Sequence, residues 1–287
     1  EEYGPAIGLY RFLSDSDPDA DSDGALRRQL ARSLHRDGQY DEALELYSRL
    51  LTALPQSTTT DSMRLARARL LAQVGRSTEA VQELTQLWAP DAGPLALVAG
   101  RLAGDILFEG GHFDEAVQAY SPLLVSAETS PTVHARTALA LIRLDRLEEG
   151  RKAAAEFAKR FGKDSPWTLI FRLEEGRFQL RHAEFDKALK LFAKIAKGAP
   201  PGPKSLAEFE ETDAELRHMA SSPAAAAAYF AATARWEKNR ADPTEELARA
   251  AIGAQLAFVE HFPDSPNAAE INLRLGNYHY NVLDLHL

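Results

Sequence analysis

The sequence predicts an all-α protein, a right-handed α-solenoid of stacked helical hairpins. The first observation is a short phrase, Gly-x-aromatic-Asp-Glu-Ala with a second aromatic residue one helical turn later, that recurs every 34 to 38 residues. Such a period is typical of units that bury their apolar faces only against neighbouring units. The second observation is that alternating β-branched runs and Asn-Gly hairpin turns are absent, which leaves no signal for strands.

Three copies of the phrase are clear, and two are degenerate. The clear copies begin at Gly38, Gly111 and Ala183, and the degenerate ones at Gly75 and Asp145. Each copy marks the turn of a hairpin and the start of its second helix. The aromatic residues of the clear copies are predicted to lie buried between helices: Tyr40, Tyr47, Phe113, Tyr120, Phe185 and Phe192.

The elements follow in order along the chain. Residues 1–23 form an N-terminal lead-in with an apolar patch and an acidic linker, and residues 24–198 form five hairpins. The hairpins are predicted at about 24–55, 61–90, 97–128, 131–162 and 166–198. Helix starts are indicated where Ser or Asp, which can cap free backbone N–H groups, precedes Pro at the first helical position. These pairs are Ser130-Pro131, Ser165-Pro166, Ser222-Pro223, Asp242-Pro243 and Ser265-Pro266.

The C-terminal third departs from the repeat. Residues 199–222 are an irregular insertion or an extra helix, because a run of prolines interrupts the pattern. Residues 223–287 hold a longer helical pair and a final helix that has no partner after it. That helix carries too many apolar residues for one buried stripe. We therefore expect an exposed patch that another repeat, another domain or a second copy of the chain covers, formed by Tyr278, Tyr280, Leu283 and Leu285.

Composition sets limits on function. The chain has 287 residues, is 45% hydrophobic and 26% charged, and has no apolar stretch near the roughly 18 residues that span a bilayer. Its net charge of −9 argues against nucleic-acid binding through bulk charge. Without cysteine it forms no disulfide or cysteine-based metal site. The sequence starts at Glu1 and has no initiator Met, which indicates a processed product or a piece of a longer protein.

The repeated phrase resembles the tetratricopeptide repeat family. That family places small residues where the two helices of a hairpin cross, and an aromatic residue one turn further. The small residues here are Ala43, Ala80, Ala116 and Ala188 in second helices and Ala31, Ala68, Gly104, Ala138 and Gly176 in first helices. The resemblance implies a scaffold for protein–protein interaction whose first helices line a concave inner face.

On that inner face the resemblance places a row of mostly basic residues. They are Arg28, Arg32, His35, Arg36, Arg69, Arg101, Phe108, Arg143, Arg177 and Arg181. Arg offers planar, permanently charged donors for carboxylates, so the groove is predicted to bind an acidic extended or helical segment of a partner protein. Alternatively, these arginines pair with Asp and Glu of neighbouring repeats. The resemblance to repeats that bind a terminal carboxylate is poor, because Arg32 and Ala66 replace asparagines of that type.

No sequence motif indicates catalysis, and no cofactor is expected. HExxH, GxSxG and P-loop patterns are absent, and the eight histidines are scattered. One segment, with Asp19, Asp21, Asp23 and Gly24, matches the first half of a calcium-binding loop. Leu30 replaces the closing Glu of that loop, so an acidic linker that caps the first repeat helix is the alternative.

A looser resemblance concerns location. His261-Phe262-Pro263-Asp264-Ser265-Pro266, followed by Leu275-Gly276-Asn277-Tyr278, is similar to the phrasing of bacterial cell-envelope repeat proteins. It implies a periplasmic or envelope-associated protein, with a cytoplasmic location as the alternative. Two functions stay open: a non-catalytic scaffold of a bacterial envelope complex, or the non-catalytic superhelical arm of a larger enzyme such as a lytic transglycosylase or kinase.

Overall fold

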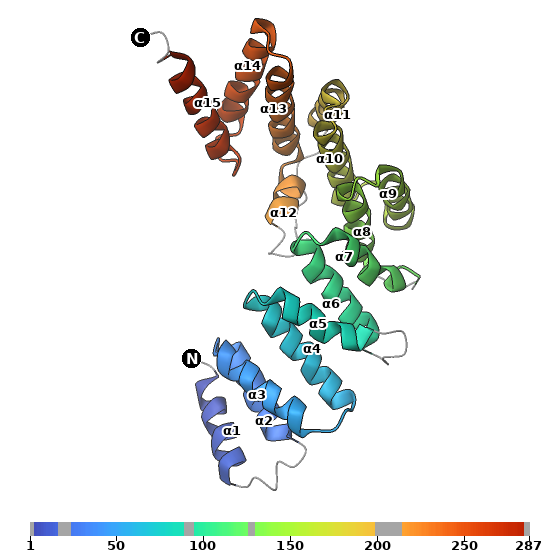
Figure 1. Cartoon of the computed structure of the whole chain (residues 1–287), viewed down its shortest axis with the longest axis vertical. Helices are drawn as coiled ribbons and strands as arrows, with labels where there is room; N and C mark the ends of the chain where they lie inside the picture. Colours follow the sequence, from blue (N-terminus) through green and yellow to red (C-terminus); the bar gives the residue numbers. More distant parts are fainter. Residues whose placement is uncertain (1–2, 17–23, 89–94, 126–129, 199–213, 284–287) are drawn as a thin grey trace. The chain divides into compact units, whose positions relative to one another are not determined.

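The computed structural model describes residues 3–16, 24–88, 95–125, 130–198 and 214–283. These residues are helical throughout apart from short turns, and no strand occurs among them (Figure 1). The predicted all-α fold of stacked hairpins is therefore confirmed. The chain divides into two compact units, residues 1–129 and residues 130–287, and each is described by itself.

Unit 1 contains a leading helix and three hairpins. The leading helix packs along the first helix of the first hairpin, and each hairpin packs on the next. Its elements are α1 (Gly4–Ser16), α2 (Ala25–Arg36), α3 (Tyr40–Ala53), α4 (Thr58–Gln73), α5 (Ser77–Trp88), α6 (Ala96–Glu109), α7 (Phe113–Tyr120) and the 3-10 turn η1 (Ser121–Leu123).

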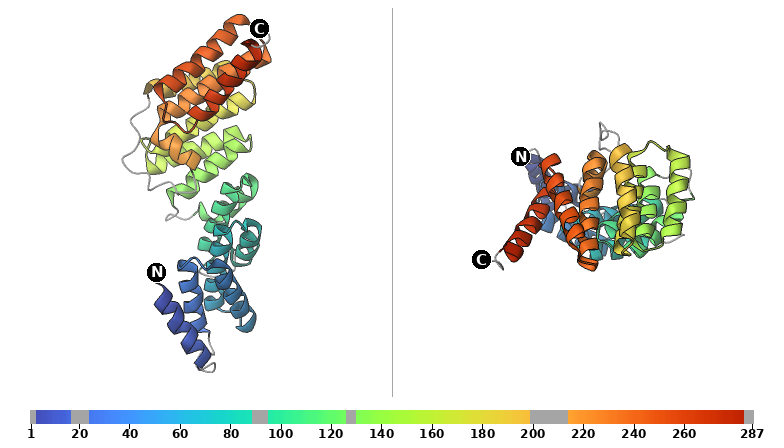
Figure 2. Two further views of the ribbon diagram at one scale, coloured as in Figure 1. Left: turned by 90° about the vertical axis from the view of Figure 1, so that its left-hand side faces the viewer. Right: turned by 90° about the horizontal axis from the view of Figure 1, so that it is seen from above.

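Unit 2 contains two hairpins, a short helix and three longer helices. Figure 2 shows the antiparallel helices of this unit side by side. Its elements are α8 (Pro131–Arg143), α9 (Leu147–Phe161), α10 (Pro166–Arg181), α11 (Phe185–Gly198), α12 (Ala214–Ser221), α13 (Pro223–Ala241), α14 (Glu245–His261) and α15 (Ala268–Leu283). The short helix α12 contacts α10 and α13.

Of the five predicted pairs, three begin a helix, since α8, α10 and α13 start at Pro131, Pro166 and Pro223. The other two do not, since α14 begins at Glu245 and α15 at Ala268. Ser130 and Ser165 are N-caps whose side chains accept hydrogen bonds from the backbone N–H two residues later. Asp242 is not an N-cap: α14 begins at Glu245, and the Thr244 side chain accepts from the N–H of Leu247. Thr244 caps the helix instead, because its hydroxyl reaches the free N–H of Leu247 in the first turn.

Each hairpin turn contains one residue with left-handed backbone geometry. In the first three hairpins this residue is Gly38, Gly75 or Gly111, with φ of 84°, 81° and 78°. Glycine adopts this conformation without steric cost. In the next two hairpins Asp145 (φ 61°) and Ala183 (φ 57°) take the same place. The repeated phrase therefore marks the same turn even where its glycine is lost.

The small residues allow the two helices of a hairpin to approach closely. A Cβ atom at Gly104 would lie 2.4 Å from the Tyr120 ring, and one at Gly176 would lie 2.3 Å from the Phe192 ring. Both rings are fully buried, as is that of Tyr47. The aromatic residues at the starts of the second helices are only half-buried, in contrast to the prediction: Tyr40, Phe113 and Phe185. Their position at the edge of the turn leaves one side of each ring uncovered.

Candidate partner-binding faces

The predicted basic residues lie on the first helices of the hairpins and fall into two sets. Unit 1 holds Arg28, Arg32, His35, Arg36, Arg69, Arg101 and Phe108. Unit 2 holds Arg143, Arg177 and Arg181. The two sets differ in their ionic partners, so each is described separately.

In unit 1 a polar contact aligns one face of α2 with one face of α4. Nε2 of His35 lies 2.9 Å from Oε1 of Gln73, and Nε2 of Gln73 donates to the hydroxyl of Tyr40 at 2.9 Å. Because an amide oxygen only accepts, the His35 ring donates in this bond. Arg32 lies one turn before His35, and Arg69 lies one turn before Gln73. We call the surface that Arg28, Arg32, His35, Arg69 and Gln73 form the α2–α4 face.

Three arginines of the α2–α4 face lack an ionic partner. Within the part of the chain that the structure describes, Arg28, Arg32 and Arg69 form no ion pair; Arg32 and Arg69 are exposed and Arg28 is half-buried. Burial raises the pKa of the Tyr47 phenol, and the nearby guanidiniums of Arg32 and Arg28 oppose that shift. Arg28 and Arg32 therefore both lie near the same buried tyrosine.

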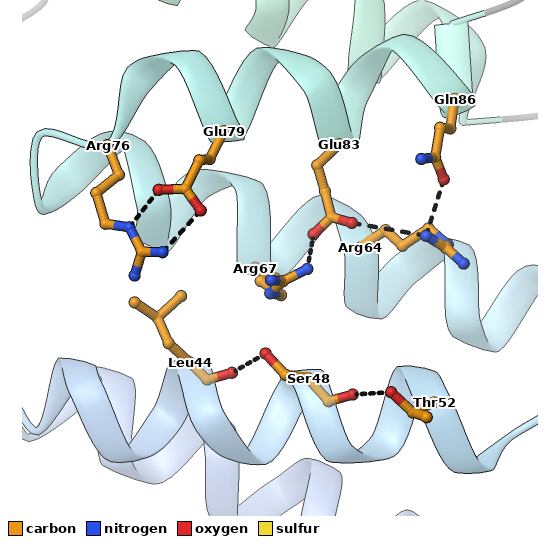
Figure 3. A network of polar contacts seen from close by, with 9 residues as sticks. All are labelled: Leu44, Ser48, Thr52, Arg64, Arg67, Arg76, Glu79, Glu83 and Gln86. Atoms are coloured by element: carbon orange, nitrogen blue, oxygen red, sulfur yellow. Dashed lines mark hydrogen bonds and ion pairs between the residues drawn. The ribbon is translucent and has the colours of Figure 1, made fainter.

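On the other side of α4, two arginines are paired with a carboxylate. Arg64 and Arg67 point toward α5, where both meet the carboxylate of Glu83 (Figure 3). Arg76 is likewise held by Glu79, through bonds of 2.6 and 2.7 Å (Figure 3). Arg69 lies about 200° around the helix from Arg67, at 100° per residue, and therefore faces away from Glu83.

The remaining predicted residues of unit 1 are less suited to binding. Arg36 lies over the ring of Tyr3, 5.9 Å from its centroid. Arg101 pairs with Asp105 at 3.5 Å. Phe108 is only 3% exposed and packs edge-on against Phe113, so its prediction as a groove residue is wrong. The residue faces the hairpin core because α6 is apolar around most of its circumference.

In unit 2 the predicted arginines form an ion-pair network. Arg143 of α8 donates to Glu174 of α10 at 2.8 Å, and Arg177 donates to the same carboxylate at 2.7 Å. Both also bond Glu215 of α12, at 3.2 and 2.6 Å. Here the alternative interpretation, pairing within the chain, describes what the arginines do.

The third arginine of unit 2 completes the network at the hairpin turn. Arg181 pairs with Asp145 at 3.1 Å and also donates to the backbone carbonyl of Ile142 at 3.2 Å. Three arginines thus meet three carboxylates, those of Asp145, Glu174 and Glu215. Glu215 is the carboxylate of this network that α12 contributes.

The centre of this network is a buried carboxylate. Burial alone would raise the pKa of Glu174, but the guanidiniums of Arg143 and Arg177 outweigh burial and hold the pKa below its ordinary value. Glu174 therefore stays ionised although it is 0% exposed. Removal of either arginine would leave a poorly compensated charge in the interior, which is strongly destabilising.

The sequence indicated neither Glu174 nor Glu215 as part of the site. Glu174 belongs to an acidic pair that reads as ordinary helix surface. Glu215 lies in the insertion 199–222 and is separated from Arg143 by 72 residues. One feature of the sequence could have indicated Glu215: the acidic stretch that ends there runs into a short helix with apolar residues. The structure places this helix against the basic face of α10.

The C-terminal helix α15 is buried on one side. Ile271 and Leu275 pack in a core with Phe258 of α14, and Tyr278 stacks edge-on against Trp236 with ring centroids 6.0 Å apart. Leu273 and Tyr280 of the same helix are 66% and 70% exposed. Of the predicted patch, Tyr280 is open and Tyr278 is half-covered. The side chain of Leu283 and the whole of Leu285 lie outside the described residues.

The predicted calcium-binding aspartates, Asp19, Asp21 and Asp23, also lie outside the described residues. Among the residues that are described, no three His, Asp or Glu side chains gather closely enough to hold a metal ion. No helix in the described ranges is both long and apolar enough to cross a membrane.

Comparison with known proteins supports the repeat assignment. Residues 4–92 match the family model described as tetratricopeptide repeat. This match begins within α1, so it includes a helix that the sequence indicated only as a lead-in. The comparison with curated proteins found no match to this sequence.

Solved structures extend the likeness over most of the chain. The C-terminal part of a TPR repeat-containing protein from Cytophaga hutchinsonii is 13% identical, with 94% of each chain covered and a TM-score of 0.57. A tetratricopeptide repeat protein from Parabacteroides merdae is 15% identical, with 87% of this chain and 90% of that chain covered and a TM-score of 0.50. Tetratricopeptide repeats generally serve as non-catalytic scaffolds that bind other proteins. Residues 4–92 of this chain therefore match the tetratricopeptide repeat model, and the chain has an α-solenoid fold like that of tetratricopeptide repeat proteins.

Proposed function

We propose that this protein is a non-catalytic scaffold of a bacterial cell-envelope complex, and that its α2–α4 face binds an acidic segment of a partner protein. The observation that supports this proposal is the set of three arginines, Arg28, Arg32 and Arg69, that meet no carboxylate within the described residues. Exposed arginines of this protein usually have such a neighbour, as Arg76 does in Glu79.

The chemistry of the face favours an acidic ligand. The protein has a net charge of −9, so a cluster of unpaired cations is a local exception to its overall charge. Each guanidinium can donate two parallel hydrogen bonds to a carboxylate. The bond between His35 and Gln73 joins α2 to α4, so the arginines of both helices lie on one face.

The experiment compares two double variants of equal charge. Arg32→Glu with Arg69→Glu changes the α2–α4 face. Arg49→Glu with Arg76→Glu, the matched control, lowers the net charge by the same amount at arginines that pair within their own helices. The probe is a fluorescein-labelled amphipathic helical peptide with glutamates along one side, and its affinity is measured by fluorescence anisotropy.

We expect the face variant to bind the probe about 100-fold more weakly, since two charge-assisted hydrogen bonds are each worth about 1.5–3 kcal/mol. The control should bind within about twofold of the unaltered chain, because exposed pairs contribute little. Circular dichroism should show equal helicity for both variants. Equal binding by the face variant and the control would contradict the proposal and would move the site to another surface.

The proposed location and assembly rest on separate observations. The segment 261–266 and the phrase at 275–278 support an envelope location, which fractionation of cells that express the full-length gene would test. The exposed side of α15, with Leu273 and Tyr280, supports self-association of the chain. Recovery of the protein only from the cytoplasmic fraction would contradict the envelope location and leave the α2–α4 face unaffected.

A further inference from the structure

We infer that α12 is a resident occupant of the basic face of unit 2, and that a partner helix with an acidic residue followed by apolar residues at positions +1, +4 and +5 competes with it for that face. The inference concerns a different face from the α2–α4 face and does not depend on it. It follows from three features of α12: its position, its charge and its packing.

The first feature is position. α12 contacts α10 and α13, and its residue Glu215 reaches Arg143 of α8 as well as Arg177 of α10. In this unit α8 and α10 are the first helices of their hairpins, which line the inner face in tetratricopeptide repeats. α12 thus lies over basic residues of these two first helices, and it belongs to the same chain.

The second feature is charge. Glu174 and Asp145 supply two carboxylates for the three arginines of the network, and Glu215 supplies the third. The Arg177 guanidinium also lies over the ring of Phe230, 5.1 Å from its centroid, so it is fixed in direction. A helix that replaced α12 would have to bring one carboxylate to this position to restore the two bonds that Glu215 makes.

The third feature is incomplete packing. Leu216, Met219 and Ala220 form a buried apolar stripe that attaches α12 to the unit. Even so, a cavity of about 320 Å³ lies against α12, lined among others by Met219, Tyr229 and Phe230. This cavity opens to the surface, because Ala214, Glu215 and Pro266 of its lining are exposed. A partner with a larger side chain at the place of Met219 would fill this space and gain contacts that α12 lacks.

The length of α12 adds to this argument. The helix has eight residues, fewer than an isolated helix needs to be stable in water. Its helical form therefore depends on the surface beneath it. When a partner helix takes the surface, α12 loses the contacts that keep it folded, so docking of α12 and docking of the partner on this face are mutually exclusive.

The test uses the full chain and a stapled, fluorescein-labelled peptide with the sequence of residues 213–222. Binding is measured by anisotropy to the unaltered chain and to a Glu215→Lys chain, whose own α12 is repelled by Arg143 and Arg177. Because apparent affinity scales with the fraction of chains whose face is vacant, we expect the Glu215→Lys chain to bind roughly tenfold more tightly. A peptide with Lys in place of Glu should lose most of this binding.

Hydrogen exchange separates displacement from general damage. In the Glu215→Lys chain the amides of α12 should exchange faster, while those of α9, which packs mainly on α8, keep their protection. Glu246→Lys, at an exposed glutamate of α14 with no ion pair among the described residues, is the matched control and should alter neither quantity. Equal peptide binding by both chains, no binding at all, or an equal loss of protection in α9 would overturn the inference. A concentration-dependent dimer of the Glu215→Lys chain would assign the face to α12 of a second copy and would also overturn it.

Discussion

Gly176 approaches Phe192 closely, so the effect of Gly176→Ala on the free energy of unfolding should change sign with the side chain at position 192. A Cβ at this position would lie 2.3 Å from Cε1 and 2.6 Å from Cζ of Phe192. The ring is fully buried and cannot swing into solvent. Such overpacking costs about 1–3 kcal/mol. Alanine regains about 1 kcal/mol of helix propensity, so Gly176→Ala should destabilise unit 2 by up to about 2 kcal/mol.

The same substitution should stabilise the unit once the ring is gone. Phe192→Leu removes the two nearest of the three ring atoms that a Cβ would meet, at its own cost of about 1–3 kcal/mol for lost burial. On that background Gly176→Ala adds only its propensity gain of about 1 kcal/mol. The coupling between the two positions should therefore be about 1–3 kcal/mol, within the range observed for residues in direct contact.

Urea unfolding that is followed by tryptophan fluorescence measures this cycle. Trp167 is fully buried in unit 2 and reports on its unfolding. A common Trp88→Phe background removes the tryptophan of unit 1 from the signal, and leaves only Trp167 and Trp236. The reasoning is refuted if Gly176→Ala has the same sign and size with Phe192 as with Leu at that position.

Two further predictions concern unit 2. Burial lowers the pKa of His134, with help from Arg160, and that of His218. Below the unfolded histidine pKa of about 6.5 the unfolded chain binds more protons, so the urea midpoint should fall as pH falls from about 7.5 to about 5.5. A His134→Gln, His218→Gln chain should show a shallower decline, and an equal decline would contradict this assignment. Light scattering should show self-association that Leu273→Glu with Tyr280→Glu abolishes; a strictly monomeric unaltered chain would contradict the proposed role of α15.

The sequence was sufficient to predict the hairpins because each depends on contacts between residues that are close in the chain. Gly104 and Tyr120 belong to one hairpin, and so do Gly176 and Phe192. The turn phrase persisted even at Asp145, where the glycine is lost. Helix starts were less certain, since Thr244 rather than Asp242 caps α14. Capping depends on which side chain reaches a free N–H group, and both candidates have suitable chemistry.

The candidate faces were only partly predictable. Helical spacing was enough to place Arg32 and Arg69 on first helices, but it does not indicate which arginines find a carboxylate within the chain. In unit 2 the deciding partners are Glu174, which only packing brings inside, and Glu215, which follows a proline-rich break. Contacts between residues so distant in sequence depend on how the helices stack, and no local pattern encodes them.

The position of α12 also affects how unit 2 should unfold. In a simple solenoid each repeat contacts only its neighbours, so the ends can fray while the middle stays intact. Through Glu215 and His218, α12 touches α8, α10 and, at Ser265, the segment that leads into α15. One short helix thus contacts both the first helix of the unit, α8, and the segment that precedes its last helix, α15. With α12 in place the unit should unfold as a single block, and its release should divide that transition into steps.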